Sequence, residues 1–219
     1  MPSFQEQTHH VEFWRALPGM ERLPSDEDRH ARVALTFDDG PDPDATEAVL
    51  AALDELGARA TFFLVGEQLL DHGELGRELL RRGHGIGLHC FRHLAMGELG
   101  KEETRKDLSQ GLDAIESATG ERPTLFRPTY GWLGEESYAA ARELGLEIVY
   151  WSAWGMDWEP LPPERIVDLV ERDLETGTIV LLHDSPRYAP RPSALPTAQA
   201  LPAIAEACAR RGLELVKLE

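Results

Sequence analysis

Apolar and polar residues follow two alternating patterns along most of the chain. Short apolar runs are typical of buried strands, and the stretches between them repeat their apolar residues every three or four positions, as helices do. Each helical stretch is followed by a glycine or a polar turn, which is a common stop signal. The pattern predicts strands at 33–37, 60–65, 85–89, 124–127, 147–152, 178–183 and 213–217. It predicts helices at 44–56, 67–82, 101–119, 135–144, 163–176 and 197–211.

This alternation predicts an α/β fold. Apolar strands joined by helices form a parallel sheet covered on both faces, either an open doubly wound sheet or a barrel. No G-x-G-x-x-G motif follows the first strand, which argues against the dinucleotide-binding open sheet, so we predict a barrel with fewer than eight strands. Residues 32–219 would form one domain, with residues 1–31 as an N-terminal extension laid over it. Residues 185–196, rich in proline, are expected to form a long loop.

Charge and hydropathy narrow the range of partners. The formal net charge of -17 argues against nucleic acid and anionic membranes, because phosphate contacts need clustered lysine and arginine. No apolar run approaches the roughly 18 residues of a membrane span. No signal peptide is visible, so we expect a cytoplasmic location, although a secreted mature form or a trimmed chain would look the same. The two cysteines exclude a disulfide scaffold, and the oligomeric state is not fixed.

Reactive residues gather where the predicted strands end. In parallel α/β barrels the chemistry lies at the carboxyl ends of the strands. The first strand ends in Asp38-Asp39. Adjacent carboxylates raise each other's pKa unless something separates their tasks, and a metal ion that takes one of them would do so.

His89 and His93 follow the third predicted strand and are candidate ligands for such an ion. Their spacing of four places both imidazoles on one side of a helical turn. Two histidines and one carboxylate form a common hydrolytic zinc set, and also the set of non-haem iron oxygenases. The alternative, two surface histidines on a turn, loses support beside Asp38-Asp39. Cys90 could compete for the metal, but we expect its side chain to point into the core.

The remaining strand ends offer a histidine, an aspartate and an arginine. His183 could donate a proton to a leaving group, because histidine titrates near neutrality. A lone histidine after a buried strand is more often a core residue whose hydrogen bonds are made within the protein. The position of His183 at the same barrel end as the other reactive residues favours a functional role instead. Asp157 is the candidate to orient His183, and Arg127 would keep a neighbouring carboxylate ionised. The alternative for Arg127 and Asp157 is an ordinary ion pair at a loop.

Five motifs occur in order at these strand ends. They are T-F-D-D-G-P at 36–41, H-C-F-R-H at 89–93, R-P-T-Y-G at 127–131, W-S-A-W-G-M-D-W at 151–158 and L-L-H-D at 181–184. Together they resemble the motifs of the polysaccharide deacetylase family, the NodB-homology or carbohydrate esterase family 4 enzymes, over about residues 32–218. The first motif is highly specific, and the others are strong only as a set.

This resemblance implies a distorted, incomplete (β/α) barrel of about seven parallel strands. It also implies one divalent metal ion, zinc by first expectation and cobalt or another ion as alternatives. The reaction would be hydrolysis of N-acetyl, less often O-acetyl, groups on sugars. By the same resemblance Asp39, His89 and His93 are the metal ligands. Asp38 is the general base that activates water, and Arg127 orients it.

The resemblance also implies roles on the leaving-group side of the site. His183 would be the general acid that protonates the leaving amine, and Asp157 would tune it. The backbone N–H of Tyr130 would help to stabilise the oxyanion. Leu181 and Trp158 would line the slot for the acetyl methyl group.

Three positions depart from the family pattern. Cys90 replaces the usual serine or threonine, Thr129 stands where proline is common, and Trp154 stands where an aspartate is often found. The catalytic positions are intact, so these changes bear on substrate choice. Trp132 and Trp154 either stack on sugar rings at the pocket rim or are packing residues under loops.

The leading functional hypothesis is a metal-dependent N-deacetylase of an N-acetylglucosamine-containing glycan or oligosaccharide. A second hypothesis is deacylation of a small or lipid-linked amide, such as an acetylpolyamine or a sugar precursor. A third is a non-catalytic carbohydrate-binding module, which would be marked by loss of Asp38 or His183. Both residues are present.

Overall fold

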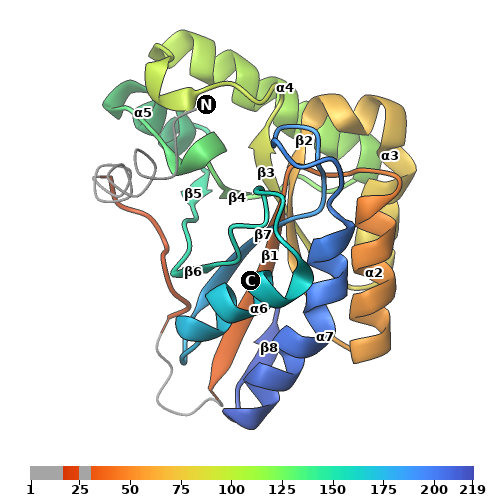
Figure 1. Ribbon diagram of the computed structural model, residues 1–219. Helices are drawn as coiled ribbons and strands as arrows, with labels where there is room; N and C mark the ends of the chain where they lie inside the picture. The colour runs from red at the N-terminus through yellow and green to blue at the C-terminus, as the bar shows by residue number, and fades with distance from the viewer. Residues whose placement is uncertain (1–16, 25–30) are drawn as a thin grey trace.

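The computed structural model describes residues 17–24 and 31–219 (Figure 1). Most of the predicted extension 1–31, including any helix within it, therefore lies outside the described residues. The strands are β1 (Arg32–Asp38), β2 (Thr61–Val65), β3 (Gly85–Cys90), β4 (Leu125–Phe126), β5 (Glu147–Ile148), β6 (Ala153–Trp154), β7 (Ile179–His183) and β8 (Glu214–Val216). The helices are α2 (Ala45–Leu56), α3 (Gly66–Arg81), α4 (Lys101–Thr119), α5 (Glu135–Glu143), α6 (Pro163–Arg172) and α7 (Leu195–Arg210), with short 3-10 turns at Met96–Glu98 and Thr129–Gly131.

The strands form one parallel sheet that curls toward closure. Its order is β5-β4-β3-β2-β1-β7-β6, with β8 beside β1. The two ends of this path, β5 and β6, are joined only by residues 149–152. Such a short link cannot span an open sheet of this width, since a residue covers at most about 3.5 Å. The fold is therefore the incomplete (β/α) barrel that the sequence predicts.

One predicted strand is wrong. In place of one strand over 147–152, the chain forms β5 at Glu147–Ile148 and β6 at Ala153–Trp154, so the described sheet holds one more short strand than predicted. The break falls where the Arg127 side chain takes backbone acceptors that a neighbouring strand would otherwise use. Its Nη2 donates to Tyr150 O at 2.9 Å and its Nε to Val149 O at 3.4 Å. The chain then turns from its pairing with β4 to its pairing with β7.

The described part of the N-terminal extension lies across this seam. Met20 N–H donates to Ile148 O, and Tyr150 N–H donates to Met20 O. Leu23 N–H donates to Gly177 O, just before β7. Residues 17–24 thus connect the two edges of the barrel opening. The boundary between extension and domain at residue 31 stays a prediction.

The helices surround the sheet and bury their apolar faces on it (Figure 1). Neighbouring pairs are α5 with α4, α4 with α3, α2 with α7, and α7 with α6. Helix α6 ends at Arg172, four residues before the predicted end at 176. The Thr178 hydroxyl donates to Asp173 O and accepts from Glu175 N–H, which turns the chain into β7. Among the described residues, no helix is long and apolar enough to cross a membrane.

Candidate active site

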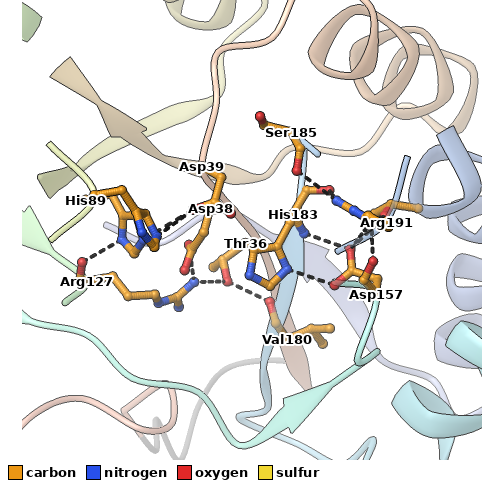
Figure 2. Close-up of polar contacts among 12 residues, drawn as sticks. Thr36, Asp38, Asp39, His89, Arg127, Asp157, Val180, His183, Ser185 and Arg191 are labelled. Atoms are coloured by element: carbon orange, nitrogen blue, oxygen red, sulfur yellow. Dashed lines mark hydrogen bonds and ion pairs between the residues drawn. The ribbon is translucent and has the colours of Figure 1, made fainter. Parts of the chain in front are cut away.

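The parallel strands bring the predicted site residues to one end of the sheet. Asp38 at the end of β1 lies in register with His183 at the end of β7. Strand β3 ends next to His89, and Arg127 directly follows β4. Figure 2 shows Asp38 between the His89 and Arg127 side and the His183 and Asp157 side. The structure therefore brings the five motifs into one site.

Asp39, His89 and His93 form a buried cluster, called here the triad cluster. One ligand atom from each residue lies within 4.8 Å of the other two. Asp39 Oδ1 is 3.5 Å from His89 Nε2 and 3.2 Å from His93 Nε2. This oxygen is buried and has no hydrogen-bond partner among the described residues. An orphaned buried carboxylate oxygen facing two imidazole nitrogens fits a divalent ion, because that donor set is a common zinc set.

Two features orient the ligand atoms of this cluster: the backbone conformation of Asp39 and the hydrogen bond made by the second ring nitrogen of His89. Asp39 adopts a φ of 80°, a conformation rare for a residue other than glycine and frequent at functional sites. His89 Nδ1 lies 2.7 Å from Arg127 O, so it carries the proton and donates to that carbonyl, leaving Nε2 as the ligand atom. Burial raises the pKa of Asp39, but its contacts with the His89 and His93 imidazoles outweigh burial and bring that pKa well below its usual value.

The turn between the two histidines is held by Asp107, on α4. Its carboxylate accepts from Phe91 N–H at 2.9 Å and from Arg92 N–H at 3.2 Å. Cys90 points into the core, as predicted, and burial raises the pKa of its thiol. Sequence reasoning missed Asp107. The available signal was an acidic residue on the apolar face of α4, beside Leu108 and one turn before Gly111.

Asp38 is held by a wholly buried arginine. Arg127 Nη1 donates to Asp38 Oδ1 at 2.9 Å and to Thr36 Oγ1 at 2.7 Å. Burial lowers the pKa of Arg127, and the Asp38 carboxylate acts against this shift. Because Asp38 and Thr36 lie on the same face of β1, one guanidinium fixes both. Asp38 itself is not part of the triad cluster.

On the far side of Asp38 lies a second set of residues, whose polar atoms are mostly hydrogen-bonded to one another. This set, called here the Asp157 network, consists of Asp157, His183, Thr197 and Arg191. Asp157 Oδ1 accepts from His183 Nδ1 at 2.8 Å, and Oδ2 accepts from His183 N–H at 2.9 Å and Thr197 Oγ1 at 2.6 Å. Arg191 Nη1 donates to the Asp157 backbone carbonyl and lies 3.3 Å from Oδ2.

The two titratable partners of this network shift in opposite directions. Burial raises the pKa of Asp157, but the charges of His183 and Arg191 outweigh it, so that pKa lies below its ordinary value. Burial lowers the pKa of His183, but the Asp157 carboxylate raises it above the ordinary value. The pair therefore favours an ionised carboxylate beside a histidine that keeps its proton.

Three further residues of the site were missed by sequence reasoning, two in the Asp157 network and one beside the triad cluster. Arg191 lies between Pro190 and Pro192 in the loop predicted at 185–196, which ends two residues earlier in the structure because α7 begins at Leu195; Thr197 lies in the first turn of α7. Tyr188 of the same loop stacks its ring on His93, with centroids 4.3 Å apart and planes 10° from parallel. No periodicity marks these positions, so only the fold reveals them.

The residues expected around the substrate lie near the two halves of the site. Tyr130 has a φ of 58°, is 44% exposed, and sets its ring edge-on to His93. Trp158 lies edge-on to His183, with centroids 5.6 Å apart. Leu181 is two residues before His183 on β7 and so lies on the same face of the sheet.

The positions that depart from the expected family pattern all make close contacts. The Thr129 hydroxyl donates to Leu94 O and so ties its turn to the histidine segment. Trp154 is half-buried and contacts Trp158 edge-on. Trp132 packs directly against Gly97, where a Cβ would lie 2.2 Å from its ring, so it is a packing residue.

Asp184 links the first motif to the last. Its carboxylate lies against Gly40, where a Cβ would meet it at 2.3 Å, so only glycine fits at that position. It accepts from Thr46 Oγ1 at 2.6 Å. Burial raises the pKa of Asp184 to about 7. The residue fixes the turn that carries Asp38-Asp39 beside the end of β7.

Fold and site together define a hydrolase built on an incomplete (β/α) barrel. Residues 25–149 match the polysaccharide deacetylase family. The chain is 38% identical over 155 residues to a peptidoglycan-N-acetylglucosamine deacetylase of Bacillus cereus, covering 69% of this chain and 72% of that protein. It is 33% identical over 192 residues to a chitooligosaccharide deacetylase of a Bradyrhizobium species, covering 84% and 87%. The chain belongs to the polysaccharide deacetylase family.

Solved structures agree with this assignment. The structure of a peptidoglycan N-acetylglucosamine deacetylase in complex with a naphthalenyl N-oxidanyl-benzamide matches with a TM-score of 0.83 and 27% identity, covering 97% of this chain and 94% of that one. Coverage of some curated relatives is much lower, 32% for the Bacillus subtilis peptidoglycan deacetylase PdaC. The predicted family, barrel and deacetylase class are confirmed.

Proposed function

We propose that this protein is a metal-dependent deacetylase that removes N-acetyl groups from an N-acetylglucosamine-containing glycan or oligosaccharide. One observation carries the proposal. Asp38 lies beside His183 in the strand register, while the adjacent Asp39 lies with His89 and His93. A carboxylate and a histidine thus face each other next to a candidate metal centre, as amide hydrolysis requires of a base and an acid.

Asp39, His89 and His93 would hold the metal ion. Zinc is the first expectation from two imidazoles and one carboxylate, with cobalt or another divalent ion as alternatives. When bound, a divalent ion polarises a carbonyl and lowers the pKa of water. The fit rests on Asp39 Oδ1, which lacks a hydrogen-bond partner in the described chain.

Asp38 acts as the general base in this proposal. It removes the proton of the attacking water, while Arg127 keeps it ionised and aimed through the 2.9 Å contact. Its carboxylate does not ligate within the triad cluster, so it is free to accept a proton. The division of labour between Asp38 and Asp39 removes the electrostatic conflict of two adjacent acids.

His183 acts as the general acid. Its Nδ1 proton is held by Asp157, so Nε2 is the nitrogen left to protonate the leaving amine. The Asp157 carboxylate raises the pKa of His183 above its ordinary value, which favours the protonated imidazole that a general acid needs. The Tyr130 backbone N–H would donate to the developing oxyanion, and Leu181 and Trp158 would contact the acetyl methyl group.

The substrate class is proposed from the named relatives, which include peptidoglycan and chitooligosaccharide deacetylases. Deacylation of a small or lipid-linked amide is the second candidate, favoured by the acidic charge of -17. A non-catalytic binding module is disfavoured because Asp38 and His183 are both present. The catalytic domain at residues 32–219 and the cytoplasmic location stay predictions.

Acetate release tests the proposal. Purified protein would be incubated with zinc or cobalt and with chitooligosaccharides, peptidoglycan, acetylxylan or acetylated polyamines. We expect release from an N-acetylglucosamine substrate and its loss on chelation, restored by the ion. Release from polyamines alone would favour the second candidate. No release from any substrate, or activity unchanged by chelator, would contradict the proposed function.

A further inference from the structure

We propose that Arg191 is a positioning residue that holds Asp157 and the end of β7 in the arrangement from which His183 donates its proton. The proposal rests on the role proposed above for His183. Arg191 lies in the loop 185–196, to which the sequence assigned no function. Its side chain is only 2% exposed.

The guanidinium of Arg191 bonds to each of the other residues of the Asp157 network, and Figure 2 shows it beside Asp157, His183 and Ser185. Its Nη1 donates to the Asp157 backbone carbonyl and to Thr197 Oγ1, the latter at 2.7 Å. Its Nη2 donates to His183 O at 3.0 Å and to Ser185 O at 3.1 Å. One side chain therefore fixes the backbone on both sides of the Asp157–His183 contact.

Thr197 passes this orientation on to the Asp157 carboxylate. Its hydroxyl accepts from Arg191 Nη1, so its own proton is directed to Asp157 Oδ2 at 2.6 Å. With Oδ2 held by Thr197 and by His183 N–H, the other oxygen, Oδ1, faces His183 Nδ1. Arg191 thus acts on His183 through three successive hydrogen bonds and through its bond to the His183 backbone carbonyl.

The permanent positive charge of Arg191 has a function beside Asp157, which accounts for its burial. A buried cation without an electrostatic partner is costly, and apolar side chains pack such a position better. His183 loses its positive charge whenever it gives up its proton. In the described chain Arg191 is then the only cation in ion-pair contact with Asp157. A fixed charge keeps Asp157 ionised in both states of His183, so His183 Nδ1 keeps its partner throughout turnover.

Three variants separate this role from simple packing. Arg191→Met keeps the length but removes the charge and all donors, whereas Arg191→Lys keeps the charge. Arg187→Met is the matched control, because Arg187 lies in the same loop and is exposed, and its side chain bonds only to Gln68 among the described residues. We expect Arg191→Met to lower kcat about tenfold to a hundredfold with KM changed less than about twofold. Arg191→Lys should recover most of that loss, and Arg187→Met should match the wild type.

A readout independent of activity is the imidazole NMR spectrum of His183 in protein labelled with ¹⁵N-histidine. We expect the wild type and Arg191→Lys to show a proton fixed on Nδ1, and Arg191→Met to show mixed tautomers or a displaced titration. Arg191→Gln replaces the Met variant if the latter does not fold. Unchanged kcat and unchanged His183 signals in a folded Arg191→Met protein would overturn the proposal. A wild type that releases no acetate, with His183 signals that still respond to Arg191→Met, would instead count against the proposed function alone.

Discussion

The triad cluster and the Asp157 network lie on opposite sides of Asp38 but differ in how their polar atoms are satisfied. In the triad cluster, Asp39 Oδ1 and His93 Nδ1 have no hydrogen-bond partner among the described residues. In the Asp157 network, both carboxylate oxygens and the His183 Nδ1 are bonded within the protein, and Arg191 Nε is the one atom left over there. The ligand atoms of the triad cluster are left free for a further group, whereas the Asp157 carboxylate and His183 Nδ1 are already bonded within the protein.

This difference separates the two tasks of the site. A metal centre needs ligand atoms that the protein itself leaves free, so orphaned atoms at Asp39 are expected there. A proton donor needs a fixed tautomer and a fixed direction, so full internal hydrogen bonding is expected at His183. Variants in each half should therefore fail in different ways.

Asp39→Asn should give the largest loss. The neutral amide is a poor ligand, so we expect metal content to fall to a small fraction of the wild-type value and acetate release to fall about a thousandfold or more. Elemental analysis and the acetate assay measure the two effects. Asp44→Asn is the control, since Asp44 is exposed and its side chain makes no cap bond. Full metal content in Asp39→Asn would remove Asp39 from the ligand set.

Asp157→Asn should leave metal content unchanged and lower turnover about a hundredfold to a thousandfold. The pH dependence of kcat should also shift, in a direction that follows from the pKa of His183. His183 must be protonated to act as the acid, so activity falls as pH rises through its pKa, which Asp157 raises above the ordinary value. Without that carboxylate, burial lowers the pKa of His183, and the alkaline limb of kcat moves to lower pH. A limb that stays in place would argue that another group titrates there.

Asp107→Ala should weaken metal binding about tenfold to a hundredfold while leaving the acid side unchanged. Asp107 accepts from two backbone N–H groups of the turn between His89 and His93, so its loss frees that turn. Isothermal titration with zinc into metal-free protein measures the affinity. Asp113→Ala on the same helix is the control, because Asp113 is exposed and pairs with Arg122. Equal affinities in both variants would show that Asp107 does not support the ligands.

Tyr188→Ala should have the smallest effect. Its stacked ring restrains His93, and a stack of this kind contributes about 1 kcal/mol, so we expect zinc affinity to fall about fivefold. Tyr188→Phe keeps the stack and loses only the bonds to Glu67 and Gln68, so its affinity should be near that of the wild type. If the Phe variant binds zinc as weakly as the Ala variant, the hydroxyl and not the ring holds the site.

Much of the fold was predictable because it depends on local pattern. Strand β2 and helix α4 match their predicted ranges within one residue, since one is a continuous apolar run and the other has an apolar stripe ended by Gly120. The gathering of Asp38 and His183 was predictable as well, because parallel strands place their carboxyl ends together. Asp38 and His183 could be placed together although they lie far apart in sequence.

The rest depends on contacts that have no local signature. The break between β5 and β6 falls where the Arg127 guanidinium bonds to Val149 O and Tyr150 O, from over 20 residues away in sequence. Arg191 bonds to Asp157 across 34 positions, and Asp107 reaches Phe91 across 16. A buried charge in a proline-rich loop looks like any exposed one until the fold is known, and the position of Asp107 on the apolar face of α4 does not say which backbone groups it holds. Partners of the motif residues were therefore missed, while the motif residues themselves were found.

The division of labour between the two adjacent aspartates is tested most directly by Asp38→Asn. The neutral amide keeps the shape and leaves the triad cluster untouched. Metal content by elemental analysis and acetate release would be measured on the same preparation, beside the wild type. We predict a full complement of metal with turnover lowered about a hundredfold to ten-thousandfold. An active Asp38→Asn protein, or one that has lost its metal, would contradict the assignment of Asp38 as the free base beside Asp39 as the ligand.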